Sequence, residues 1–133
     1  MKDEIKTDAI DALLGFLPAF EAADGSPGEW RAEPGQLPYF CPDDTLVDFV
    51  QALYRHDWVV PFDWPAWREE ADRFVSSPGL LASADLDVVR KLLTTHVRQD
   101  RFCEGHLAEM VRSGHIAALL RRLRELRDRP TIS

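Results

Sequence analysis

Apolar residues recur at intervals of three and four positions along almost the whole chain, and this spacing restricts the fold more than any other feature. On an α-helix such spacing gathers the apolar side chains on one face, whereas an amphipathic strand needs alternation at every second position. We therefore predict an all-α fold, a single-domain orthogonal bundle of five or six helices. The predicted helices are residues 4–22 (kinked or split by Pro18), 43–56, 63–75, 83 to 98 or past 103, a short one around 107–111, and 116–129.

Residues 24–42 interrupt this pattern with three glycines and four prolines. Such a density excludes a long helix or a central strand, because both residue types weaken those structures. The segment also contains four large apolar side chains, whereas a disordered linker would carry few. These are Trp30, Leu37, Tyr39 and Phe40. We predict an ordered, irregular Pro/Gly-rich strap at residues 24–42, packed over the helices.

The formal net charge is −7, but it is unevenly spread. Residues 1–44 have a balance of −7, residues 45–89 of −5, and residues 90–133 of +5. An acidic whole argues against a dedicated nucleic-acid binder, which needs a broad positive surface. The basic last third leaves room for an anion site, or for attraction to the acidic remainder or to a second copy in a homodimer.

Length and composition place residues 1–133 in one helical domain. No run approaches the roughly 18 uncharged apolar residues of a membrane span, and the acidic N-terminus lacks a signal-peptide pattern. We therefore expect a cytoplasmic protein with no membrane partner. No phosphate-binding loop or dinucleotide fingerprint is present, so no cofactor is expected, with zinc as the one alternative.

The end of the fourth predicted helix and the residues after it hold the densest set of reactive side chains. One hypothesis is a zinc site, since thiolate and imidazole are ligands that suit zinc. Its ligands would be His96, Cys103, His106 and His115. On one straight helix His96 and Cys103 would lie about 10 Å apart, too far for one ion, so the site needs a break near Arg101. A packed core histidine is the simpler interpretation of His96.

A second hypothesis is a cysteine-dependent hydrolase with Cys103 as the nucleophile and His106 as its base. A nearby helix N-terminus and Arg101 could lower the pKa of the thiol. The chemistry also needs a third group that orients the base, and no cysteine-enzyme signature is present. The alternative is a free cysteine that packs as a small apolar side chain.

A third hypothesis is an anion site on the fourth helix, where Thr94, Arg98 and Arg101 are spaced to share one face. Two guanidinium groups beside a hydroxyl could hold a phosphate or a carboxylate. Trp64, from the aromatic block at residues 58–67, could line the same site. The alternative is that these arginines form ion pairs with the acidic part of the chain, for example with Asp57 or Asp63.

The stretches VVPFDWPAW at residues 59–67, RFCEGH at 101–106 and SGHI at 113–116 resemble a family of small bacterial and archaeal proteins catalogued as a domain of unknown function. The likeness runs from about Leu13 to Arg127. The resemblance implies a stand-alone cytoplasmic prokaryotic protein and carries over no activity, cofactor or catalytic residue.

From the residues we expect a binding or interaction module that holds an anionic small ligand or a protein partner at an arginine-bearing helix face. One alternative is a metal-assisted or cysteine-dependent hydrolase that uses Cys103 and His106. Another is a structural subunit of a homo- or hetero-oligomer. Each of these functions would use the candidate residues already given for its site.

Overall fold

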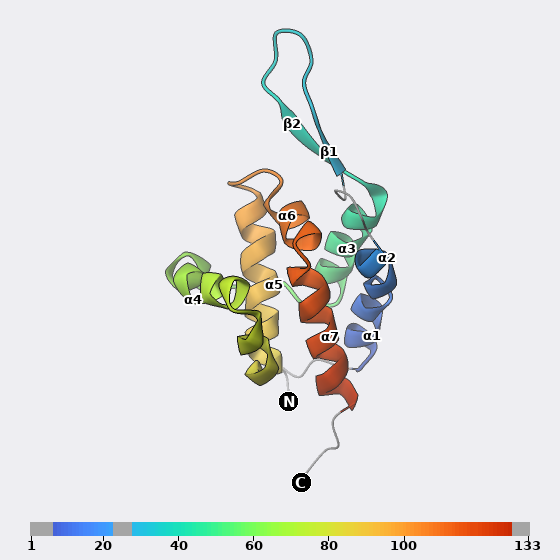
Figure 1. The fold of residues 1–133 in the computed structure, drawn as a ribbon, viewed down its shortest axis with the longest axis vertical. Helices are drawn as coiled ribbons and strands as arrows, with labels where there is room; N and C mark the ends of the chain where they lie inside the picture. Colours follow the sequence, from blue (N-terminus) through green and yellow to red (C-terminus); the bar gives the residue numbers. More distant parts are fainter. Residues whose placement is uncertain (1–6, 23–27, 129–133) are drawn as a thin grey trace.

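The computed structural model describes residues 7–22 and 28–128, and it confirms a predominantly helical, single-domain fold. Figure 1 shows α5 and α7 side by side, with α4 lying across α5. The helices are α1 (Thr7–Leu14), α2 (Leu17–Ala22), α3 (Asp44–Arg55), α4 (Trp64–Ser76), the 3₁₀ helix η1 (Pro78–Ser83), α5 (Leu86–Asp100), α6 (His106–Arg112) and α7 (His115–Asp128). No helix in the described part is both long and apolar enough to cross a membrane.

The first predicted helix is split, but not at Pro18. The α-helical hydrogen bonds of α1 end at Gly15, whose N–H donates to the Asp11 carbonyl, and α2 begins at Leu17. Pro18 thus lies in the first turn of α2, where the missing N–H of proline has no intrahelical partner to lose. Residues 4–6 of the prediction lie outside the described residues.

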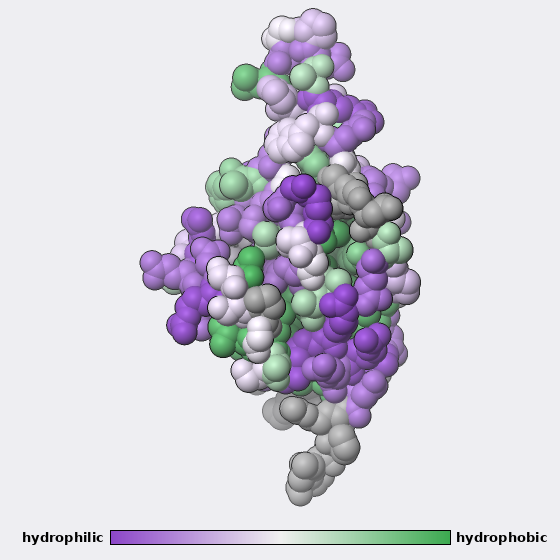
Figure 2. All heavy atoms as spheres, in the orientation of Figure 1, coloured by the Kyte–Doolittle hydropathy of each residue, from purple (hydrophilic) through white to green (hydrophobic). Residues whose placement is uncertain are grey.

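The predicted irregular strap is wrong in its described part, which forms a β-hairpin. Strands β1 (Gly28–Arg31) and β2 (Tyr39–Pro42) pair antiparallel, with Trp30 opposite Phe40. The hairpin projects beyond the helical body (Figures 1 and 2), and Phe40 at its base packs against the core. Proline and glycine are compatible with this arrangement because Pro34 and Gly35 lie in the connecting loop, and Gly28 and Pro42 face each other in the last pair of the two short strands. Residues 24–27 of the strap lie outside the described residues.

One side chain holds the hairpin to the bundle. The Phe40 N–H donates to Glu104 Oε2 at 2.9 Å, which ties β2 to the turn between α5 and α6. Gly105 also approaches the hairpin closely, because a Cβ at this position would lie 2.9 Å from the Trp30 ring. Glycine at 105 therefore allows the turn to approach the base of the hairpin.

The extended stretch before α4 has no partner strand in the described residues, and a side chain on α5 holds it instead. Thr94 Oγ1 donates to the Trp58 carbonyl at 3.0 Å and accepts from the Val60 N–H at 3.1 Å. Trp58 is fully buried and its Nε1–H donates to the Ala9 carbonyl at 3.1 Å. These bonds fix the stretch between α1 and α5.

The starts of α3 and α4 agree with the predicted ranges, whereas α5 begins later than residue 83. Asp43 and Asp63 accept hydrogen bonds from the N–H groups of the first turns of α3 and α4. Ser83, where the fourth helix was predicted to begin, belongs to η1, and its hydroxyl donates to the Leu80 carbonyl. Asp85 caps α5 by accepting from the Val88 N–H at 2.9 Å.

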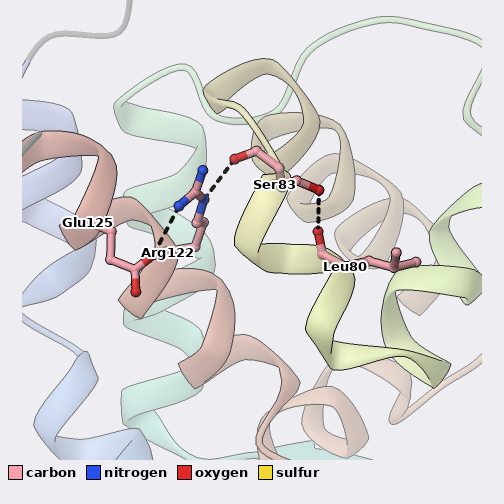
Figure 3. Close-up of polar contacts among 5 residues, drawn as sticks. Leu80, Ser83, Arg122 and Glu125 are labelled. Carbon is pink, nitrogen blue, oxygen red and sulfur yellow. Dashed lines mark hydrogen bonds and ion pairs between the residues drawn. The ribbon is translucent and has the colours of Figure 1, made fainter.

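Helix α7 contacts α1, α2, α5, α6 and η1. Three of its arginines bind other residues of the chain: Arg121, Arg122 and Arg127. Arg122 is buried and donates to the Ala84 carbonyl at 2.8 Å. Figure 3 shows Arg122 between Glu125 and the end of η1. Arg121 pairs with Glu21 at 2.8 Å, so the basic last third and the acidic first third attract each other within one chain.

Candidate functional site

Helix α5 ends at Asp100, and a turn leads to α6. Asp100 Oδ1 accepts the Leu107 N–H at 2.9 Å, which satisfies a free donor at the start of α6. Gly105 precedes α6 with φ of 86°, a conformation that side-chain-bearing residues rarely adopt. The break that the zinc hypothesis needs near Arg101 is therefore present, and it turns the chain back toward α5.

The turn brings three histidines together. His106 is the first residue of α6 and His115 the first residue of α7, and both rings contact His96 on α5. His106 Nε2 lies 3.1 Å from His96 Nδ1, and His115 Nε2 lies 3.1 Å from His96 Nε2. We call these residues the histidine chain. His96, at its centre, is 2% exposed.

Burial keeps the histidine chain neutral. It lowers the pKa of His96 well below the usual value, and the two neighbouring imidazoles lower it further. Burial lowers the pKa of His115 to about 4, with His106 acting in the same direction. Burial also lowers the pKa of half-buried His106, although the carboxylates of Asp100 and Asp72 oppose the shift. All three rings are uncharged at neutral pH.

The three imidazoles are linked by two successive hydrogen bonds, and their nitrogen atoms do not surround a single point where a metal ion could lie. His96 uses both ring nitrogens, and these face different neighbours, so one ion cannot bind both. Among residues 7–22 and 28–128 no group of three or more histidine, cysteine, aspartate or glutamate side chains is placed to hold a metal ion. Of the four ligands of the zinc hypothesis, the structure brings together His96, His106 and His115, whereas Cys103 lies exposed on the turn.

The contact between Cys103 and His106 is a backbone hydrogen bond and does not involve their side chains. The His106 N–H donates to the Cys103 carbonyl at 2.9 Å, while the His106 ring faces His96. In the described part of the chain no hydrogen bond joins the Cys103 thiol to an imidazole. The arrangement therefore does not supply the nucleophile–base contact that the hydrolase hypothesis needs.

Arg98, Arg101 and Trp64 line a common pocket, whereas Thr94 does not. The pocket has a volume of about 330 Å³, and its lining comprises Val60, Pro61, Phe62, Trp64, Arg98, Arg101 and Phe102. Thr94 is fully buried, and its hydroxyl holds the stretch before α4. We call this hollow the arginine pocket.

The two arginines of the arginine pocket have no carboxylate partner within the described residues. Of the two carboxylates considered as partners in the sequence, that of Asp63 caps α4. Asp57 accepts from Arg90 at 2.6 Å through its backbone carbonyl, and no ion pair joins either carboxylate to Arg98 or Arg101 within the described residues. Six other arginines of the described chain do form ion pairs, namely Arg31, Arg73, Arg112, Arg121, Arg122 and Arg127. Arg98 and Arg101 thus present unneutralised charge to the pocket.

Phe102 also lines the arginine pocket, although no sequence pattern above pointed to it. Its ring is 80% exposed and its centroid lies 6.0 Å from that of Trp64. Its exposure could have been predicted from the sequence. Phe102 directly follows Arg101 and lies beyond the last turn of the helix, so it is not part of the apolar face that the helix buries. Arg68 and Asp72 were also missed; they follow Trp64 along α4 at two successive intervals of four, which indicates a shared face, and both act on the pKa of His106.

These features define a small helical protein with a histidine chain in its core and an open arginine pocket beside it. The chain belongs to the Family of unknown function (DUF6508), whose model matches residues 5–129. The resemblance to a domain of unknown function is therefore confirmed. Comparison with curated proteins and with solved structures finds no match.

Proposed function

We propose that the protein binds a small anionic ligand in the arginine pocket. The observation that carries the proposal is that Arg98 and Arg101 line one hollow and have no carboxylate partner in the described residues. Guanidinium groups bind phosphate and carboxylate oxygens through paired N–H donors. In a chain with a net charge of −7, two arginines left without acidic partners are available for an external anion.

The shape of the site favours a small molecule over a protein segment. A volume of about 330 Å³ lies at the lower end of the range for small-ligand pockets. Apolar walls from Val60, Pro61 and Phe62 limit the water that competes for the arginines. The stretch that carries these walls is fixed to α5 by Thr94, so the pocket is formed before a ligand arrives.

The experiment is a thermal-shift titration at low salt with inorganic phosphate and with citrate. We expect at least one anion to raise the melting temperature, because a ligand that binds only the folded state stabilises it by mass action. The double variant Arg98→Gln/Arg101→Gln should abolish that rise. Arg124→Gln, which removes an exposed positive charge on α7, is the matched control and should keep it.

Two results would contradict the proposal. One is the absence of any anion-dependent shift in the unmodified protein. The other is a shift of equal size in the double variant, which would place the anion elsewhere. A change confined to the baseline melting temperature of the double variant would show that the arginines act in stability alone.

A further inference from the structure

The side chain of Phe102 is large and apolar, yet most of it is exposed to solvent. It is 80% exposed at the end of α5, next to Arg101, and it faces the half-buried Trp64 at a ring-centroid distance of 6.0 Å and an interplanar angle of 34°. An exposed phenylalanine contributes little to the core, whereas a flat surface beside a second ring suits an aromatic ligand.

Phe102 and Arg101 form a ridge between two hollows. They line the arginine pocket on one side and a second hollow of about 490 Å³ on the other. The second hollow lies under the base of the hairpin, and its lining comprises Phe40, Pro42, Leu46, Asp100, Arg101, Phe102, Glu104 and Gly105. A ligand on the ridge can therefore reach both sides of Phe102.

The two sides differ in charge. The arginine pocket contains Arg98 and Arg101 and no acidic residue in its lining. The second hollow contains the carboxylates of Asp100 and Glu104. Each accepts one backbone N–H, from Leu107 and Phe40, and each keeps further acceptor capacity. Arg101 lines both hollows, so an anionic group is favoured on the first side, where two arginines and no carboxylate lie, over the second, where two carboxylates accompany one arginine. A ligand with one anionic end and one uncharged end suits this difference.

We infer that the arginine pocket takes a phosphate monoester whose other end is a flat aromatic ring, the chemistry of a nucleoside monophosphate. This inference rests on the proposed function. The phosphate binds Arg98 and Arg101, and the ring stacks on Phe102 beside Trp64 with its polar edge toward Asp100 and Glu104. Stacking of a base on an aromatic side chain is worth about 1–3 kcal/mol, roughly five- to 150-fold in affinity.

The test is isothermal titration calorimetry of the full chain at low salt with four probes: adenosine monophosphate, ribose 5-phosphate, inorganic phosphate and adenosine. We expect adenosine monophosphate to bind about tenfold or more tightly than ribose 5-phosphate. Phe102→Ala should remove this advantage, bringing the affinity for adenosine monophosphate down to that for ribose 5-phosphate. Because Phe102 is exposed, the variant should fold normally. Leu37→Ala, at an equally exposed apolar side chain of the hairpin loop, is the matched control.

The outcomes separate the two proposals. Equal affinity for adenosine monophosphate and ribose 5-phosphate, unaffected by Phe102→Ala, would overturn the aromatic-ring inference while leaving anion binding intact. Binding of citrate without binding of any phosphate would also overturn it. The absence of binding of any anion would overturn both. Retention of the ring's advantage in Arg98→Gln/Arg101→Gln, with loss of phosphate affinity, would support the division of roles.

Discussion

Acidification should destabilise this protein because the histidine chain is neutral when folded. The perturbation is a fall from about pH 7.5 to about pH 5.0, a range in which most aspartates and glutamates stay ionised. Burial holds the pKa of His115 at about 4 in the folded protein, against 6.5 for an exposed histidine. The unfolded chain therefore binds protons first, so the contribution of His115 is complete above pH 6.5 and is lost as the pH falls.

The size of the effect follows from the two pKa values of His115. At about pH 5.0 the difference corresponds to a loss of about 2 kcal/mol relative to pH 7.5, and in the acid limit to about 3.4 kcal/mol. Burial lowers the pKa values of His96 and His106 in the same direction, so their contributions add to this loss. A loss of this size is a large fraction of the stability of a small domain.

Urea unfolding at several pH values, followed by tryptophan fluorescence, to which buried Trp58 contributes, measures this loss directly. His115→Gln should reduce the pH dependence by about 2 kcal/mol, because the amide does not titrate. His56→Gln, which replaces a histidine outside the histidine chain, is the matched control for the substitution itself. A free energy of unfolding that stays level from about pH 7.5 to about pH 5.0 would refute the assignment of neutral buried imidazoles.

Three further predictions concern the elements around the site. Thr94→Val should cost about 1–3 kcal/mol in urea unfolding, since the Val60 N–H loses its acceptor; an unchanged midpoint would contradict the role of this hydroxyl. Gly105→Ala should destabilise more than Gly35→Ala, because both have positive φ but only Gly105 approaches Trp30; the difference in melting temperature measures that contact. Added zinc should leave the melting temperature unchanged, and a rise would show that the three imidazoles can rearrange around an ion.

Much of the helical framework was predictable from local signals. Apolar spacing located the helices, and Asp43 and Asp63 identified two helix starts, because caps and stripes depend on residues within one or two turns. The hairpin was not predictable in the same way. Its strands each contain four residues, too few for a clear alternation, and their pairing depends on contacts across the connecting loop.

The same contrast between local and tertiary contacts applies to the candidate sites. Sequence spacing placed Arg98 and Arg101 on one face of α5, and both line the arginine pocket with Trp64. It also assigned Thr94 to that face, but α5 is packed on more than one side, so the hydroxyl is buried. The meeting of His96 with the two later histidines depends on the turn after Asp100, whose course helical spacing does not specify.

The histidine chain couples the beginnings of two helices through a single proton position. When neutral His96 carries its proton on Nδ1, it donates to His106 and accepts from His115; when the proton is on Nε2, both directions reverse. The remaining Nδ1 atoms of His106 and His115 are consequently always of opposite kind, one a donor and the other an acceptor. Any group that fixes the tautomer of the imidazole at the start of α6 also fixes the one at the start of α7.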